Sequence, residues 1–206
     1  MTDWLKTAMC CATICGLSMA QPVDLILIAG DLNATTHGQV DDLSQQLEEL
    51  VTVQESVLYR GATSGVQDAQ TWKPAGAISG QFGVEMGMAY TLAERHPNHA
   101  FGIMRYAHPT STMMCDWHPD PCGESHLASM LAQVEHWRDE LKGPSRVIGM
   151  VWVHGELDAQ DEDAAFHYQE SLFEFAQAVR NAFEHPSLPL ILTIPHAQGM
   201  WAHSIE

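Results

Sequence analysis

The fold is decided by the stretch Val23-Asp24-Leu25-Ile26-Leu27-Ile28-Ala29, which breaks into Gly30-Asp31-Leu32-Asn33. Nearly every residue before the break is apolar, a pattern typical of a parallel strand that is buried on both faces. Similar apolar runs follow along the chain, at residues 57–59, 100–106, 147–153 and 188–193. We therefore expect five strands in one parallel sheet.

Amphipathic patterns with helical spacing lie between these runs. They cover residues 40–54, 85–95, 125–141 and 161–183. The last is the longest, and its apolar stripe from Ala165 to Phe183 indicates core packing. Strands that alternate with helices predict a three-layer α/β/α sandwich with a parallel, flavodoxin-like sheet. Ligands of such folds bind at the carboxyl ends of the strands, so the loops after Ala29, Tyr106 and Val153 are the candidate site.

The charge of the chain limits its partners. Its 206 residues include 26 Asp and Glu against 9 Lys and Arg, which gives a net charge of −17 with neutral His. This length suits one domain with a sizeable core. The negative field repels phosphate backbones and anionic lipid headgroups, so neither nucleic acid nor a membrane surface is an expected partner. A neutral or cationic ligand agrees better with this charge.

Residues 1–20 read as a secretory signal peptide. Lys6 precedes a weakly apolar stretch, and the small residues Ser18 and Ala20 suit cleavage after Ala20. The mature domain is then residues 21–206, in a secreted or periplasmic protein. The alternative is an amphipathic helix that stays on the protein, and neither version is long enough to span a bilayer.

Two of the five cysteines, Cys115 and Cys122, lie outside this leader. In an oxidising compartment they are able to close a short loop as a disulfide. Two alternatives stay open. One is a pair of free thiols, and the other is a zinc site that adds His118 and His126, with a spacing unlike that of standard structural zinc sites.

Two strand ends carry motifs, Gly30-Asp31-Leu32-Asn33 and the later stretch Trp152-Val153-His154-Gly155-Glu156-Leu157-Asp158. They resemble the SGNH-hydrolase superfamily, in its branch of sialate O-acetylesterases and related carbohydrate acetylesterases. In that branch the first motif reads Gly-Gln-Ser-Asn or Gly-Asp-Ser-Asn, and the second reads Trp-His-Gln-Gly-Glu-Ser-Asp. Further similarities at residues 71–74, 82–94 and 103–107 occur in the family's order, and the resemblance extends over residues 22–195.

The resemblance implies a serine esterase that removes acetyl groups from sugars without a metal or an organic cofactor. It also implies a substrate pocket formed by Gly30, Asp31, Asn33, His154, Gly155 and Glu156. The nucleophile position, however, holds Leu32, and leucine has no lone pair for attack on an acyl carbon. Leu157 replaces the serine of the second motif. His154 replaces the glutamine of that motif, which helps to hold the oxyanion in the family. An imidazole N–H is able to donate the same hydrogen bond.

The family's general base is the His of an Asp-x-x-His motif near the C-terminus, where the Asp orients the imidazole. No Asp follows Asp163, so this motif is missing and the fold is expected to be shortened at its C-terminal end. The histidines that remain there are His185, His196 and His203. Substitute hydroxyls would be Thr35, Thr36 or Ser79, with His37 or His154 as base, but no spacing supports a specific pair.

Several roles stay open for the acidic and amide residues. Asp31 and Asn33 either line the pocket or only stabilise the turn. Glu156 and Asp158 either accept hydrogen bonds from loop amides or form an acid/base couple. Three functions remain: an active acetylesterase, a non-catalytic glycan-binding pseudoenzyme, and a vestigial interaction domain. The missing nucleophile and base favour an inactive or severely impaired copy, whose partner is an acetylated carbohydrate.

Overall fold

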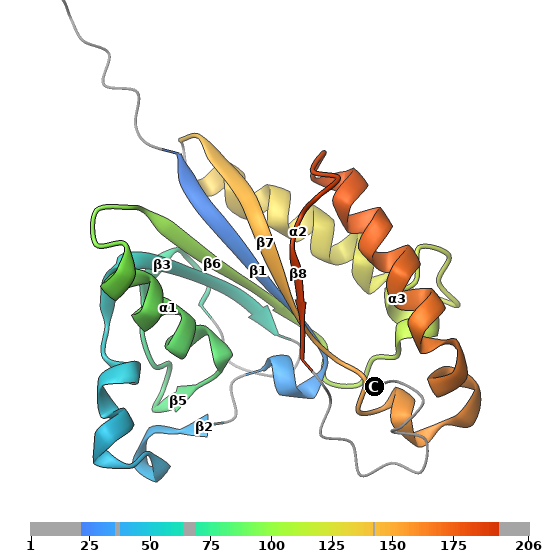
Figure 1. Ribbon diagram of the computed structural model, residues 1–206, viewed down its shortest axis with the longest axis horizontal. Helices are drawn as coiled ribbons and strands as arrows, with labels where there is room; N and C mark the ends of the chain where they lie inside the picture. Colours follow the sequence, from blue (N-terminus) through green and yellow to red (C-terminus); the bar gives the residue numbers. More distant parts are fainter. Residues whose placement is uncertain (1–21, 36–37, 64–68, 142, 194–206) are drawn as a thin grey trace, which may run out of the picture.

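A computed structural model describes residues 22–35, 38–63, 69–141 and 143–193 of the chain. Six strands form its main sheet in the order β4-β3-β6-β1-β7-β8 (Figure 1). Their bounds are β1 Val23–Gly30, β3 Gln54–Thr63, β4 Lys73–Ala75, β6 Phe101–Ala107, β7 Ser145–Val153 and β8 Leu190–Leu192. All neighbours pair in parallel except β4, which is antiparallel to β3. The predicted parallel α/β sheet is therefore confirmed.

The central strand β1 lies between β6 and β7, and this position assembles the candidate site. Gly30 at the end of β1 pairs with Ala107 of β6 on one side and with Val153 of β7 on the other. Because parallel strands end at the same edge, the three loops singled out from the sequence leave the sheet side by side.

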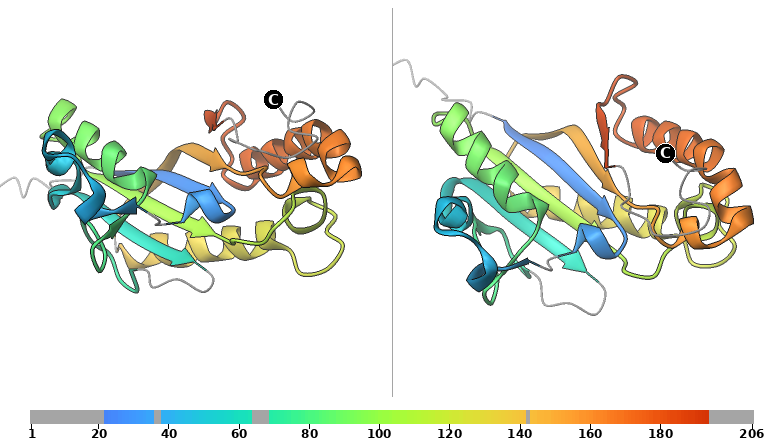
Figure 2. Two further views of the ribbon diagram at one scale, coloured as in Figure 1. Left: turned by 90° about the horizontal axis from the view of Figure 1, so that it is seen from below. Right: turned by 60° about the horizontal axis from the view of Figure 1, so that its bottom comes forward.

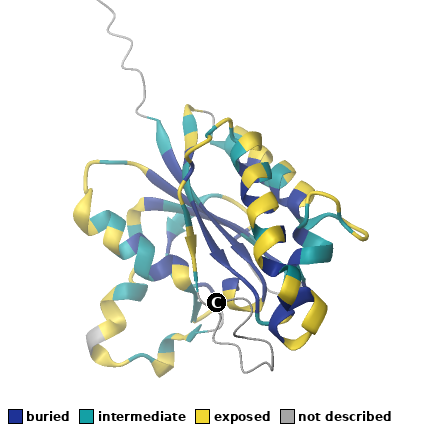
Figure 3. Ribbon diagram, turned by 45° about the vertical axis from the view of Figure 1, so that its right-hand side comes forward, coloured by how far each residue is buried: buried dark blue, intermediate teal, exposed yellow. Residues whose placement is uncertain are grey.

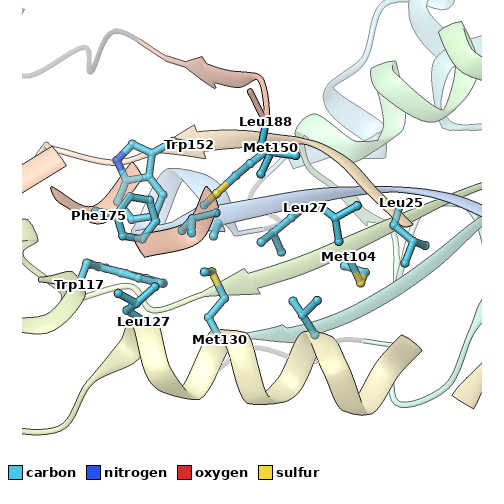
Figure 4. Packing of buried hydrophobic residues seen from close by; sticks show 14 of the residues in the cluster. Leu25, Leu27, Met104, Trp117, Leu127, Met130, Met150, Trp152, Phe175 and Leu188 are labelled. Carbon is cyan, nitrogen blue, oxygen red and sulfur yellow. The ribbon is translucent and has the colours of Figure 1, made fainter. Parts of the chain in front are cut away.

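Helices cover both faces of the sheet, which gives the three expected layers (Figures 1 and 2). Helix α1, Val84–Arg95, packs on one face, whereas α2, His126–Glu140, and α3, Glu162–Ala182, pack on the other. Leu25 and Leu27 of β1 pack in the cluster on the side of α2 and α3 (Figure 4). Ile28 of the same strand packs in the cluster on the side of α1. The central strands β1, β6 and β7 are mostly buried, whereas the edge strand β8 and the outer helix faces are exposed (Figure 3). Continuous apolar runs are what two covered faces require.

Side-chain caps fix where the two longer helices begin. Ser125 accepts a hydrogen bond from the Ala128 amide at 3.0 Å, and Asp161 accepts one from the Ala164 amide at 2.9 Å. Each cap satisfies one of the amide groups that have no partner in the first turn of a helix. The sheet edge that carries the candidate site is also where α2 and α3 begin.

One predicted element is wrong. Residues 40–54 form no α-helix but two 3₁₀ helices, Val40–Asp42 and Gln45–Val51, before β3 begins at Gln54. Leu43 and Ser44 have extended backbones between them, and Leu47 of the predicted apolar stripe is 44% exposed. The short strands β2, Gly38–Gln39, and β5, Gln81–Phe82, pair beside this region and were not expected.

Cys115 and Cys122 form a disulfide in the structure. Both sulfurs are consumed in that bond, so the zinc alternative with His118 and His126 has no thiolate ligands here. The described ranges also hold no group of three or more His, Cys, Asp or Glu side chains arranged to bind a metal ion. Among those same residues, no helix has the length and apolarity to cross a bilayer. The predicted signal peptide and the predicted C-terminal shortening fall outside the described residues.

Candidate active site at the carboxyl edge of the sheet

Gly30 permits the close approach of β1 and β7 on which the site depends. Its φ is +148°, and a Cβ atom at this position would lie 1.8 Å from the carbonyl oxygen of Val153. The next amide, that of Asp31, donates to this same carbonyl at 3.0 Å. On the other side the His108 amide donates to the Gly30 carbonyl at 2.9 Å. The backbone therefore ties all three loops together at Gly30.

The turn after Gly30 is a short 3₁₀ helix, Leu32–Ala34, held by Asp31. One carboxylate oxygen of Asp31 accepts from the Asn33 amide at 3.2 Å, and the other accepts from the Gly155 amide at 3.2 Å. The Asn33 side-chain amide in turn donates to the carboxylate of Glu156. The structure thus brings together five of the six predicted pocket residues, and Asp31 and Asn33 also stabilise the turn.

Leu32 stands on this turn with 48% of its surface exposed, and Leu157 across the edge is 38% exposed. Two leucines with this exposure are an unusual feature at a strand-end turn that is otherwise polar. The nearby Thr35 hydroxyl donates to the Leu32 carbonyl at 2.6 Å, and Thr35 is only 2% exposed. This hydroxyl closes the turn and does not face a substrate. Ser79 lies in an exposed turn before β5, while Thr36 and His37 lie outside the described residues.

Asp31 carries a proton at neutral pH. Burial, reinforced by the neighbouring Glu156 carboxylate, raises the pKa of Asp31 to about 8. Only 2% of Asp31 is exposed, so water offers little help to its charged form. A protonated Asp31 lets the two acidic side chains share the same strand-end turn.

This arrangement predicts that replacing Asp31 by Asn removes a pH dependence of stability. The pKa of Asp31 is higher in the folded protein than in the unfolded chain. The free energy of unfolding of the wild type therefore falls as the pH rises from the pKa of an unfolded-chain aspartate, 3.8, towards about 8. Each pKa unit corresponds to about 1.4 kcal/mol. The asparagine of Asp31→Asn stays neutral at every pH and lacks this loss. The free energy of unfolding of Asp31→Asn minus that of the wild type should therefore increase from about pH 5 to about pH 8.

Urea unfolding of both proteins at the two pH values measures this difference. Titrating groups that do not interact with Asp31 are common to the two proteins and cancel in the comparison. Asp42→Asn, which changes an exposed carboxylate, serves as the control and should run parallel to the wild type. A stability difference between Asp31→Asn and wild type that does not change with pH would contradict the assigned protonation.

The side chain of His154 is turned into the core and has no exposed surface. Its ring stacks on Trp152 with 4.9 Å between centroids, and its Nδ1 lies 3.4 Å from Asp158 Oδ2. Burial lowers the pKa of His154 to about 3, so the ring is neutral. An oxyanion donor must face the substrate. In this structure the ring instead belongs to the aromatic core around Trp117, with ring centroids 6.3 Å apart.

Asp158 accepts a hydrogen bond from a loop amide, which favours a structural role over that of an acid or base. Its Oδ1 accepts a hydrogen bond from the Met113 amide at 2.9 Å, and its side chain is fully buried. Burial raises the pKa of Asp158 to about 7. Asp158 therefore fixes the loop that carries the disulfide to the end of β7. Asp158 and Glu156 point to different partners and do not form a couple around one reacting atom.

Residues 22–205 match the family model described as carbohydrate esterase, sialic acid-specific acetylesterase. The chain belongs to this family. Among curated proteins no match was found. Family membership agrees with the resemblance of the two strand-end motifs, which now lie on adjacent strands.

Solved structures with the same fold include three that share little sequence with this chain. A protein from Arabidopsis thaliana is 17% identical, with a TM-score of 0.66. The superposed part is 89% of this chain and 79% of the Arabidopsis chain. NanS is 13% identical, with a TM-score of 0.60, over 84% of this chain and 67% of the NanS chain. XAC1771, a carbohydrate acetylesterase from Xanthomonas citri, is 16% identical, with a TM-score of 0.57, over 82% of this chain and 40% of the XAC1771 chain. At these identities the likeness supports the α/β fold of the family.

Proposed function

We propose that this member of the carbohydrate esterase family binds O-acetylated carbohydrate at the carboxyl edge of the sheet and does not hydrolyse it. The observation that carries the proposal is Leu32. It occupies the exposed strand-end position at which the family's nucleophile is expected, on a turn that Asp31 and Asn33 still hold in place. An aliphatic side chain cannot form an acyl intermediate, so serine-esterase chemistry has no starting point there.

A second missing part supports the same proposal. The sequence contains no Asp-x-x-His, the motif that would supply and orient a general base. Of the substitutes considered above, the Thr35 hydroxyl closes its own turn and the His154 ring is buried. Neither of these two side chains therefore provides an exposed nucleophile or base at Leu32.

The ligand class follows from the family. The family description names sialic acid-specific acetylesterase, and XAC1771 is described as a carbohydrate acetylesterase. An O-acetylated sugar is therefore the first ligand to test. The polar groups around Leu32, among them the Asn33 amide and the Glu156 carboxylate, are of the kind that hydrogen-bond sugar hydroxyls.

We also propose that the mature domain, residues 21–206, works outside the cytoplasm. The signal-peptide pattern of residues 1–20 supports this location, and so does the Cys115–Cys122 disulfide, because disulfides persist mainly in oxidising compartments. The intact mass of protein secreted by an expressing cell tests it. The mass expected is that of a chain beginning at Gln21, and a retained leader would contradict cleavage.

The proposed loss of turnover is tested by acetate release from p-nitrophenyl acetate and from an O-acetylated sugar. No release above a heat-denatured control is expected from the folded protein. Turnover that is abolished by a His154 substitution but kept in Leu32→Ala would mean a rewired hydrolase. A protein that neither binds nor turns over these compounds would be a vestigial interaction domain.

Restoring the nucleophile alone is not expected to restore the enzyme. Leu32→Ser supplies a hydroxyl, but without a base to take its proton the serine remains a weak nucleophile. In a serine protease, loss of the base costs about as much rate as loss of the whole triad, roughly a millionfold in kcat. Acetate release by Leu32→Ser should therefore stay near that of the wild type. Efficient turnover by this single variant would show that another residue serves as base.

A further inference from the structure

A cavity lies beside the candidate site, and no role has yet been given to it. It encloses about 390 Å³ at the carboxyl ends of β3 and β6, against the start of α2. Its polar lining consists of Thr63, Tyr106, His108, Glu124, His126 and Ser129. The His108 amide donates to the Gly30 carbonyl at 2.9 Å, so the wall of this cavity is bonded directly to the turn that carries Leu32.

Two stacked imidazoles form one wall of the cavity. The rings of His108 and His126 lie 3.9 Å apart between centroids with an interplanar angle of 26°. Burial and the adjacent His108 lower the pKa of His126, against the opposing influence of Asp116 and Glu124. The small interplanar angle makes this wall a flat face of two stacked rings. The Glu124 carboxylate is exposed beside it.

This lining suits the hydroxyl groups of a sugar. A carboxylate accepts two hydrogen bonds, imidazole nitrogens and hydroxyls both donate and accept, and a flat ring packs against the C–H face of a pyranose. The cavity therefore offers the chemistry of a sugar subsite. The nature of the sugar depends on which charges surround it.

No lysine or arginine lines this cavity, and the contacts of the basic residues explain why. Three arginines are paired with carboxylates elsewhere: Arg60 with Glu140, Arg105 with Glu85, and Arg146 with Asp24. Arg95, Arg138 and Arg180 lie in the last turns of their helices, at the edge opposite to the one where those helices begin. Lys73 lies in the edge strand β4.

The undescribed segments that follow the strands add no lysine or arginine to those named above. Of the nine Lys and Arg, only Lys6 and Lys142 fall outside the described residues, in the leader and after α2. Residues 36–37, 64–68 and 194–206 follow β1, β3 and β8, and their sequences contain neither Lys nor Arg. These three undescribed segments therefore carry no permanent positive charge of their own.

We propose that the His108–His126 cavity is a sugar subsite that selects uncharged O-acetylated sugars over acidic ones. This inference rests on the proposed function and specifies its ligand. An acidic sugar would place its carboxylate near Glu124 without a lysine or arginine in the lining to balance it, and such like-charge placement rejects a ligand. The preference differs from the acidic sugar that the family description names.

The test compares the binding of two ligands to the full chain at neutral pH and physiological salt. The ligands are 6-O-acetyl-N-acetylglucosamine, which is uncharged, and 9-O-acetyl-N-acetylneuraminic acid, which is acidic. Isothermal titration calorimetry or ligand-observed NMR gives both affinities. We expect the uncharged sugar to bind at least about tenfold more tightly.

A pair of charge reversals locates the selectivity. Glu124→Arg places a cation at the mouth of the cavity, whereas Glu55→Arg makes the same change of net charge at an exposed position at the other end of β3. Glu124→Arg should strengthen binding of the acidic sugar about tenfold and weaken that of the uncharged sugar. Glu55→Arg should leave both affinities within about twofold of wild type, because its charge is distant and screened.

The outcomes separate the subsite from the proposed function. Equal or tighter binding of the acidic sugar by the wild type would overturn the selectivity and leave carbohydrate binding intact. The same response in Glu124→Arg and Glu55→Arg would show that the overall field, and not this cavity, sets the preference. Binding of neither sugar would overturn the proposed function itself, and the inference with it.

Discussion

Gly30→Ala is expected to lower the free energy of unfolding by roughly 3–5 kcal/mol, a large part of the total stability of a domain. Two costs combine. The added Cβ would lie 1.8 Å from the Val153 carbonyl oxygen, so β1 and β7 must separate at the site. The φ of +148° is also one that residues with side chains rarely adopt, and holding such a residue there costs about 1–3 kcal/mol.

Urea unfolding of Gly30→Ala measures this loss, with Gly87→Ala as the matched control. Gly87 lies inside α1, and a Cβ there meets no atom within 4 Å. The control should gain about 0.5–1 kcal/mol, because alanine is the better helix former. The two variants thus make the same chemical change with opposite expected signs. Equal stability of Gly30→Ala and wild type would show that β1 and β7 do not approach as the structure has them.

Glu85→Gln is expected to cost about 3–5 kcal/mol, the loss typical of breaking a buried ion pair by removing one charge. One oxygen of Glu85 accepts from Arg105 at 3.0 Å, and the other accepts from the Gly83 amide at 2.9 Å. The side chains are only 3% and 0% exposed, so Arg105 would keep its charge without the carboxylate that balances it.

Chemical denaturation of Glu85→Gln and Glu94→Gln compares a buried with an exposed glutamate on the same helix. Glu94 is exposed, so its substitution should stay within about 0.5 kcal/mol of wild type. A loss of the same size in both variants would contradict the role of the pair. Since Glu85 holds the start of α1 beside the turn after β1, its loss should also weaken sugar binding.

The parts of the fold that the sequence predicts are those with one dominant physical signal. The apolar run before Gly30 has no polar face, so only a strand covered on both sides satisfies it. The equivalent run before His154 becomes β7, and the two strands pair directly. Because parallel strands end at one edge, Asp31 and Glu156 meet although 125 positions separate them along the chain.

The parts that the sequence does not predict depend on contacts between distant residues. The leucine spacing within residues 40–54 indicates a helix, but Leu43 and Ser44 adopt extended backbones that divide the segment. Its distant contacts include the Val40 amide with the Gly80 carbonyl and the Glu49 carboxylate with the Tyr90 hydroxyl. The direction of the His154 ring follows from the aromatic packing of Trp117, Trp152 and Tyr168, which no local motif encodes. The stacking of His108 on His126 likewise joins two loops that are separate in sequence.

The central claim is that the site has kept binding and lost turnover, and one NMR sample measures both. The folded protein is mixed with an uncharged O-acetylated sugar, and saturation transfer to the sugar and the free acetate signal are followed together over time. The account predicts saturation transfer that a competing sugar abolishes, with acetate no higher than in a heat-denatured control. Acetate that accumulates in proportion to the amount of protein would contradict it.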